Sequence, residues 1–185
     1  MTWAGIAGGG DPAKRSKADF YPTPPDVTVA LLKTGLVPKV ADIWECACGD
    51  GRLLNVLTKR GYTAVGSDIQ DGFDFLQQRE MLFGTDWTIT NPPFSLAEEF
   101  IEHAADLGVP FAFLLKANFW NAARRFPLFV DYPPSYVLPL TWRPDFLFGA
   151  GGGAPLMDCA WNVWLPDDRS TTFRPLPRPS KEDMG

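Results

Sequence analysis

Apolar and polar positions along the chain form two alternating patterns. Short, continuously apolar segments bounded by Gly, Pro or Asp are typical of buried strands, whereas apolar residues three or four positions apart are typical of amphipathic helices. The segments with strand character span residues 40–46, 62–68, 86–90, 110–117, 135–140 and 158–166. The segments with helix character span residues 26–35, 51–61, 95–108 and 121–132. Because the two kinds alternate, the pattern predicts an α/β fold in which a mostly parallel sheet has helices on both faces.

Three details refine this prediction. The last two strand segments have no helix between them, so we expect them to pair as a C-terminal β-hairpin on a Rossmann-like sheet. In the third helical segment, Ser95 can cap the helix and Glu98 can complete a capping box. Pro127 lies inside the fourth helical segment and leaves the end of that helix undetermined.

Composition predicts one folded domain with weakly structured ends. The chain has 185 residues, 45% of them hydrophobic and 21% charged, which is typical of a globular protein. Residues 1–17 are glycine-rich and then basic, and residues 167–185 are proline-rich without an apolar period. We therefore expect a flexible arm at 1–17, a single domain at 18–166, and a flexible tail at 167–185.

Charge and cysteine content restrict the classes of function. The formal net charge of −5 argues against binding nucleic acid by bulk charge alone, although a local basic edge remains compatible with it. Three cysteines and one histidine do not form a zinc-ligand pattern, so we expect no metal. The longest apolar runs fall short of the roughly 18 residues that a membrane helix needs, so we expect a cytoplasmic protein with reduced cysteines.

The turn between the first strand and the second helix carries the first candidate site. Gly49 and Gly51 allow a tight turn and close approach of a ligand to the backbone. Asp68 ends the next strand, 19 residues after Gly49. An acid about 20 residues beyond a glycine turn commonly bonds ribose hydroxyls at the carboxyl edge of a sheet. The alternative is an ordinary strand-to-helix turn without a ligand.

The residues of this turn favour a nucleoside without phosphate. The third glycine of the dinucleotide fingerprint is replaced by Leu54, and Asp50 would repel a pyrophosphate. S-adenosylmethionine has a ribose and no phosphate, and its positive sulfonium and ammonium groups are compatible with Glu45 and Asp50. A second glycine-rich segment, Gly149–Ala154, precedes a strand rather than a helix, so we interpret it as a loop whose contact with a substrate the sequence leaves open.

The stretch that follows the third strand carries the second candidate site. Asn91 should lie at the same sheet edge as Gly49 and Asp68, and Pro92 and Pro93 make the corner rigid. The amide oxygen of Asn91 and the carbonyl of Pro92 are two fixed acceptors, which suits a planar NH₂ group. Phe94 can stack on the ring that carries this group. A rigid turn in which Asn91 caps a helix is the alternative.

These motifs resemble those of S-adenosylmethionine-dependent DNA N6-adenine methyltransferases of the small phage and prophage type. The similarity covers residues 19–165 and comprises "DFYPTPP", "ECACGDG", "NPPF" and "CAWNVW". It implies a class I methyltransferase fold with a seven-stranded type of sheet, S-adenosylmethionine as cofactor, and methylation of a flipped adenine in DNA. The implied cofactor-binding residues are Tyr21, Thr23, Glu45, Cys46, Ala47, Gly49, Asp50, Gly51, Asp68, Ile69 and Asp74. The implied catalytic residues are Asn91, Pro92, Pro93 and Phe94.

Contacts with nucleic acid need basic residues at the same edge. Four basic residues follow late strands and form a candidate phosphate-binding rim: Lys116, Arg124, Arg125 and Arg143. Ordinary solvated surface charge is the alternative for each of them. Few residues remain outside the predicted sheet, so sequence choice would come from loops or from a partner, or would be weak. A homo-oligomer and a separate specificity partner both stay open from the sequence.

Three functions remain open from the sequence. The first is adenine methylation in DNA. The second is the same chemistry on RNA adenine or on a protein glutamine. The third is a cofactor-binding regulator without catalysis, which would have no chemical need for the Asn91–Phe94 corner.

Overall fold

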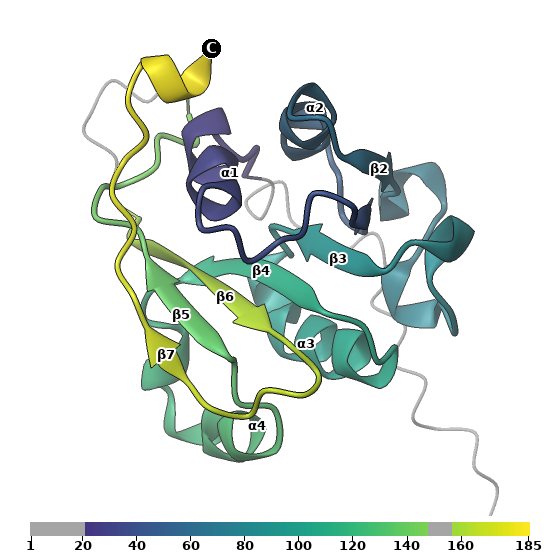
Figure 1. The fold of residues 1–185 in the computed structure, drawn as a ribbon. Helices are drawn as coiled ribbons and strands as arrows, with labels where there is room; N and C mark the ends of the chain where they lie inside the picture. Colours follow the sequence, from purple (N-terminus) through teal and green to yellow (C-terminus); the bar gives the residue numbers. More distant parts are fainter. Residues whose placement is uncertain (1–20, 148–156) are drawn as a thin grey trace, which may run out of the picture.

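The computed structural model describes residues 21–147 and 157–185, so the predicted arm at 1–17 and the Gly149–Ala154 loop lie outside it. Its strands form one sheet of order β2-β1-β3-β4-β6-β5-β7 (Figure 1). The strands are β1 (Asp42–Glu45), β2 (Thr63–Gly66), β3 (Trp87–Thr90), β4 (Phe111–Lys116), β5 (Tyr136–Pro139), β6 (Cys159–Trp164) and β7 (Thr172–Phe173). Six of them lie within the segments that the sequence predicts to be strands, and β7 is additional.

The strand directions place several carboxyl ends at one edge of the sheet. β2, β1, β3 and β4 are parallel, with Thr90 of β3 opposite Phe113 of β4. β6 is antiparallel to both β4 and β5, which confirms the predicted C-terminal hairpin. The connection from β1 runs to β2 on one side, whereas the connection from β3 runs to β4 on the other, so the two diverge between β1 and β3. In sheets of this kind, ligands bind beside the carboxyl ends of strands at such a point.

Helices cover both faces of the sheet (Figure 1). They are α1 (Pro25–Leu32), α2 (Arg52–Lys59), α3 (Ala97–Asp106) and α4 (Phe126–Asp131). α1 and α2 pack on one face in a core cluster with Leu114, and α3 and α4 pack on the other in a cluster with Phe113 and Leu115. Neighbouring residues of β4 thus point to opposite faces, and β4 is buried almost throughout.

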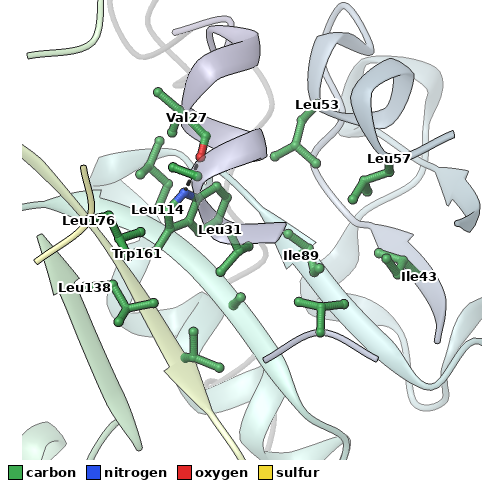
Figure 2. Packing of buried hydrophobic residues seen from close by; sticks show 14 of the residues in the cluster. Val27, Leu31, Ile43, Leu53, Leu57, Ile89, Leu114, Leu138, Trp161 and Leu176 are labelled. Atoms are coloured by element: carbon green, nitrogen blue, oxygen red, sulfur yellow. Dashed lines mark hydrogen bonds between the residues drawn. The ribbon is translucent and has the colours of Figure 1, made fainter. Parts of the chain in front are cut away.

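Trp161 of β6 ties helix α1 to the centre of the sheet. Its side chain is fully buried, and its indole Nε1 donates a hydrogen bond of 2.9 Å to the carbonyl oxygen of Val27 (Figure 2). Val27 and Leu31 pack in the same cluster. A buried indole N–H needs an acceptor, and here the acceptor belongs to the first turn of α1. This contact holds the segment that precedes α1 close to the sheet.

Two predicted helix boundaries are wrong. α3 begins at Ala97, not at Ser95, because residues 94–96 form a 3₁₀ turn and Leu96 is the N-cap without a side-chain cap bond. Glu98 instead pairs with Arg124 and Arg125. α4 begins only at Phe126, so its proline lies in the first turn, where a missing backbone N–H is tolerated.

Short 3₁₀ turns fill the rest of the connections. The segment between β2 and β3 contains η3 (Ile69–Asp71), η4 (Phe75–Gln77) and η5 (Leu82–Gly84). η6 (Phe94–Leu96) leads into α3, η7 (Phe119–Asn121) and η8 (Ala123–Arg125) precede α4, and η9 (Glu182–Met184) ends the chain. Over the two described stretches, no helix is both long enough and apolar enough to cross a membrane.

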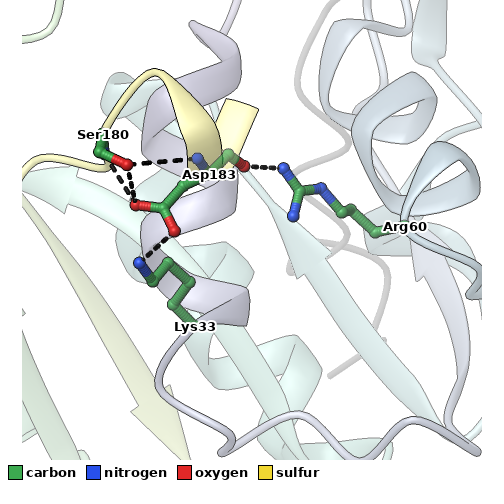
Figure 3. Close-up of polar contacts among 4 residues, drawn as sticks. All are labelled: Lys33, Arg60, Ser180 and Asp183. Carbon is green, nitrogen blue, oxygen red and sulfur yellow. Dashed lines mark hydrogen bonds and ion pairs between the residues drawn. The ribbon is translucent and has the colours of Figure 1, made fainter. Parts of the chain in front are cut away.

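The tail at 167–185 was expected to be flexible, but the structure attaches it to the domain. β7 pairs in parallel with β5 and forms the edge of the sheet, and Leu176 is only 5% exposed. Near the end of the chain, Asp183 accepts from Lys33 through its carboxylate and from Arg60 through its backbone carbonyl (Figure 3). Edge strands offer unpaired backbone groups, and a proline-rich segment without an apolar period can still occupy them.

The burial of Leu176 predicts a measurable stability difference within this tail. Leu176→Ala should lower the free energy of unfolding by about 2–5 kcal/mol, because a buried leucine is lost from the core. Phe173→Ala is the control, since Phe173 lies in β7 and is 67% exposed. It should change stability by no more than about 0.5 kcal/mol. Urea denaturation measures both, and equal effects would contradict the anchoring of the tail.

Candidate active site

The glycine turn after β1 is held by the acid at the end of β2. The backbone N–H of Gly49 donates to Asp68 Oδ2 at 3.0 Å, and the N–H of Gln70 donates to Asp68 Oδ1 at 3.0 Å. Gly49 and Gly51 have positive φ angles of 52° and 75°, which glycine adopts without steric cost. Asp68 is 2% exposed, so its orientation is set by these bonds. A carboxylate oxygen can accept more than one hydrogen bond.

Glu45, the last residue of β1, is an unusual buried acid. Its side chain is 3% exposed, and Oε2 has no hydrogen-bond partner among the residues that the structure describes. Burial raises the pKa of its carboxyl well above the ordinary value of 4.5, a backbone hydrogen bond from Leu54 opposes the shift, and the charges of Asp50 and Asp68 add to it. A cationic or NH-bearing ligand group would relieve this environment.

A pocket opens at the carboxyl edge of the sheet, between the glycine turn and the Asn91–Phe94 corner that follows β3 (the β3 corner). Its lining residues are Tyr21, Pro22, Thr23, Glu45, Ala47, Cys48, Gly49, Asp50, Arg52, Leu53, Asp68, Asn91 and Pro93. The structure thus brings together seven of the candidate cofactor residues, Tyr21, Thr23, Glu45, Ala47, Gly49, Asp50 and Asp68. Two of the candidate catalytic residues, Asn91 and Pro93, border the same pocket.

Asn91 is fixed by a contact that the sequence did not reveal. Its side-chain Nδ2 donates a 2.9 Å hydrogen bond to the backbone carbonyl of Tyr21, 70 residues earlier. This bond orients the amide, and the opposite atom, Oδ1, is buried and accepts no hydrogen bond from any described residue. Tyr21 also contacts Phe94, with ring centroids 5.4 Å apart and planes tilted by 35°. The segment before α1 therefore builds one wall of the β3 corner.

Four candidate cofactor residues do not line this pocket. Cys46 is buried in the core cluster on the α3 face. Gly51 forms the N-cap of α2, and Ile69 begins η3. Asp74 caps η4 by accepting 3.0 Å hydrogen bonds from Leu76 N and Gln77 Nε2. The two remaining residues of the β3 corner, Pro92 and Phe94, also lie outside the lining, and Phe94 instead contacts Tyr21.

Sequence reasoning missed four lining residues: Pro22, Cys48, Arg52 and Leu53. Arg52 Nε pairs with Asp50 Oδ2 at 2.7 Å, which offsets the acidic charge of the turn. Cys48 packs against the end of β2, where a Cβ on Gly66 would lie 3.1 Å from Cys48 Sγ and 2.9 Å from Leu54 Cδ2. Their position within or beside the glycine turn was the signal that could have identified Cys48 and Arg52.

The predicted basic rim divides into paired and unpaired residues. Arg124 and Arg125 both contact Glu98 Oε1, at 2.9 and 2.8 Å, and Arg143 contacts Asp158 at 2.8 Å. The side chain of Arg125 is 16% exposed and also donates to the carbonyl of Phe119, so its guanidinium is held by contacts within the protein. Lys116 instead places its ammonium 4.7 Å from the centroid of the Phe94 ring.

Comparison with known proteins identifies the fold. No protein-family model and no curated protein matches the chain. Among solved structures, a candidate class I S-adenosylmethionine-dependent methyltransferase from Listeria monocytogenes matches 82% of this chain and 65% of its own, with TM-score 0.53 and 16% identity. A modification subunit of a candidate type I restriction enzyme from Vibrio vulnificus matches 90% and 49%, with TM-score 0.57 and 12% identity. The chain has the class I methyltransferase fold.

One further comparison limits what the fold alone can say. A candidate hemolysin from Lactococcus lactis matches 84% of this chain and 95% of its own, with TM-score 0.54 and 10% identity. The chain spans about two thirds of the Listeria protein and half of the Vibrio subunit. Within residues 21–147 and 157–185, no group of three or more His, Cys, Asp or Glu side chains could hold a metal ion. The fold by itself therefore does not identify the reaction.

The environment of Glu45 predicts a pH-dependent change in stability. The Glu45 carboxyl has a higher pKa in the folded chain than in the unfolded chain. The free energy of unfolding is therefore highest below pH 4.5 and falls as the pH rises through the folded-state pKa. Glu45→Gln removes this loss and keeps an acceptor for Leu54 N–H. At pH 7, without ligand, it should stabilise the protein, whereas at pH 4 it should leave the stability nearly unchanged.

Thermal unfolding at pH 4 and pH 7 measures this effect. Glu99→Gln, at an exposed glutamate of α3, is the matched control and should show a small change at both values. A Glu45→Gln variant that is no more stable than the native protein at pH 7 would contradict the assignment of Glu45 as a strained buried acid.

Proposed function

We propose that the protein binds S-adenosylmethionine in the pocket of Glu45 and Asp68 and transfers its methyl group to the N6 amine of adenine in DNA. The charge of the pocket supports this cofactor. Glu45, Asp50 and Asp68 surround it, and Glu45 Oε2 lacks a partner among the described residues. A ligand with positive groups and no phosphate fits such a site, and Asp68 at a strand end is placed to accept from ribose hydroxyls.

The observation that carries the proposed reaction is the buried oxygen of Asn91. Buried polar atoms in native proteins nearly always have a hydrogen-bond partner, so an exception calls for an explanation. Asn91 Nδ2 is already committed to the Tyr21 carbonyl, which leaves Oδ1 as a fixed acceptor beside the pocket. An incoming amine would supply the donor. A corner that served only to cap a helix would not need this oxygen, and α3 begins six residues later with Leu96 as its N-cap.

Positioning supplies most of the catalysis in this scheme. When bound, S-adenosylmethionine supplies an electrophilic methyl group on a sulfonium. Asn91 Oδ1 and the Pro92 carbonyl accept the two amine hydrogens, which keeps the nitrogen lone pair available for the new N–C bond. As methyl donor, S-adenosylmethionine would keep the electron pair of the C–S bond on its sulfur, and water would take the proton that the methylated amine loses. Holding the amine in line is worth a large part of the barrier.

DNA is the substrate that the surroundings of the corner favour. Phe94 can stack on a base, and Lys116 brings a positive charge to the same ring. The Vibrio neighbour is described as the modification subunit of a restriction enzyme. Another neighbour, BpuSI, is described as a type IIG restriction endonuclease and matches 86% of this chain with TM-score 0.55 and 12% identity. An adenine inside a duplex would have to be flipped out to reach Asn91, at a cost of a few kcal/mol.

Asn91→Ala tests the proposed chemistry. The variant should still bind S-adenosylmethionine, because the acids of the pocket are unchanged. It should lose methyl transfer by about 100-fold or more, because the amine is no longer positioned. Transfer of radiolabelled methyl groups to duplex DNA measures activity, and calorimetry measures cofactor binding. Asn55→Ala, at an exposed asparagine of α2, is the matched control and should keep both.

The choice of acceptor in the same assay distinguishes the alternatives. Native protein is incubated in parallel with DNA, with RNA and with a protein extract. Label in N6-methyladenine from DNA supports the proposal, whereas label confined to RNA or protein contradicts it. Binding of S-adenosylmethionine without label in any acceptor would indicate a regulator without catalysis.

A further inference from the structure

Lys116 differs from the other basic residues at the candidate site. It is the last residue of β4, the strand next to β3, so it lies at the same sheet edge as Asn91. The other three rim residues, Arg124, Arg125 and Arg143, have carboxylate partners. Within the described part of the chain, the ammonium of Lys116 instead contacts the Phe94 ring. Lys116 is half-buried, and an anionic ligand can replace a contact of this kind through charge-assisted hydrogen bonds to the ammonium.

Phe94 has two neighbours that compete with a stacked base. Tyr21 contacts the ring and is itself held, because its carbonyl accepts from Asn91 and its own ring packs edge-on against Phe146 at 5.7 Å. Lys116 contacts the ring through a long, flexible side chain. A base that stacks on Phe94 must displace one of the two. Displacing Tyr21 would disturb the hydrogen bond that orients Asn91. Lys116 is therefore the side chain that can move away from the Phe94 ring.

A hollow beside Lys116 has room for the lysine ammonium and for a phosphate group of a substrate strand. It has a volume of about 490 Å³ and is lined by Lys116, Ala117, Asn118, Asn121, Met157 and Asp158. The side chains of Asn118 and Asn121 offer neutral donors. Asp158 is the acidic group of the hollow, and its pairing with Arg143 at 2.8 Å offsets its charge. A phosphate in this hollow would therefore meet Lys116 as its cationic partner.

We propose that Lys116 shields the Phe94 ring and moves to a phosphate of the DNA strand when the target base enters, so that phosphate recognition uncovers the stacking platform. This inference rests on the proposed function and deepens it. A neutral acceptor, such as a glutamine side chain, has no anion to draw Lys116 away from the ring. Lys116 is thus a positioning residue that favours an adenine carried on a phosphate backbone.

The salt dependence of binding tests this role independently of catalysis. A fluorescent single-stranded DNA oligonucleotide that contains adenine is titrated with protein and S-adenosylhomocysteine at several salt concentrations. A single-stranded probe avoids the cost of base flipping. Each phosphate contact contributes about 0.7 to the slope of log K against log salt. Lys116→Ala should lower the slope by about 0.7, and Lys116→Arg should restore it.

Lys59→Ala is the matched control, because Lys59 is exposed at the C-terminal end of α2, whereas the site lies at its N-terminal end. It should keep the native slope. Thermal unfolding of all variants shows that they are folded, and calorimetry shows that Lys116→Ala still binds S-adenosylhomocysteine.

The outcomes separate this inference from the proposed function. A native slope in Lys116→Ala, with methyl transfer to DNA by the native protein, overturns the role of Lys116 and leaves the function standing. A lowered slope without methyl transfer by the native protein overturns the function and supports the phosphate contact. Failure of the native protein to bind the oligonucleotide at low salt overturns the role of Lys116 in DNA recognition.

Discussion

A hydrogen bond between Asn91 Nδ2 and the backbone carbonyl of Tyr21 joins the two parts of the site. Tyr21 lies just before α1, and α1 is held on the sheet by the Trp161–Val27 contact and by the core around Leu31. Asn91 follows β3 on a corner made rigid by two prolines. Because both partners are anchored, the amide has one orientation, and its buried Oδ1 has no hydrogen-bond partner among the described residues. The proposed chemistry depends on this orientation more than on the acidity of any side chain.

The second constraint is the concentration of acids around the glycine turn. Glu45 and Asp68 are both nearly fully buried, and Asp68 fixes the turn by accepting from Gly49 N–H. Burying two carboxyl groups costs stability unless a partner compensates for it, and a cationic ligand is such a partner. The turn therefore combines a stable element, the Asp68 bonds, with an unstable one, the Glu45 carboxyl. Functional sites commonly combine the two in this way.

Much of the fold was predictable because it follows from local patterns. The alternation of buried strands and amphipathic helices identified the sheet, and the missing helix between the last two strands identified the hairpin. The Asn91–Phe94 corner and the Gly49–Asp68 pair were predictable as motifs, since residues at carboxyl ends of parallel strands meet at one edge. Their assembly with Tyr21 around one pocket agrees with that expectation, while the roles of these residues remain predictions.

The features that the sequence did not reveal are those that depend on distant partners. No sequence pattern near Leu176 predicts that this segment pairs with β5. No pattern near Asn91 predicts its hydrogen bond to the carbonyl of Tyr21. The predicted cap at Ser95 failed because Glu98, needed for the capping box, pairs with Arg124 and Arg125 from the segment after β4. Asp74 was expected at the cofactor, but its carboxylate caps η4. In each case a long-range or competing hydrogen bond decides the position of the side chain.

A crystal structure with S-adenosylhomocysteine and an adenine-containing DNA oligonucleotide tests the central claim most directly. The account predicts that Asn91 Nδ2 remains on the Tyr21 carbonyl while Asn91 Oδ1 lies about 3 Å from the N6 atom of the flipped adenine. An adenine bound elsewhere, or an Asn91 amide that turns away from the base, would contradict it.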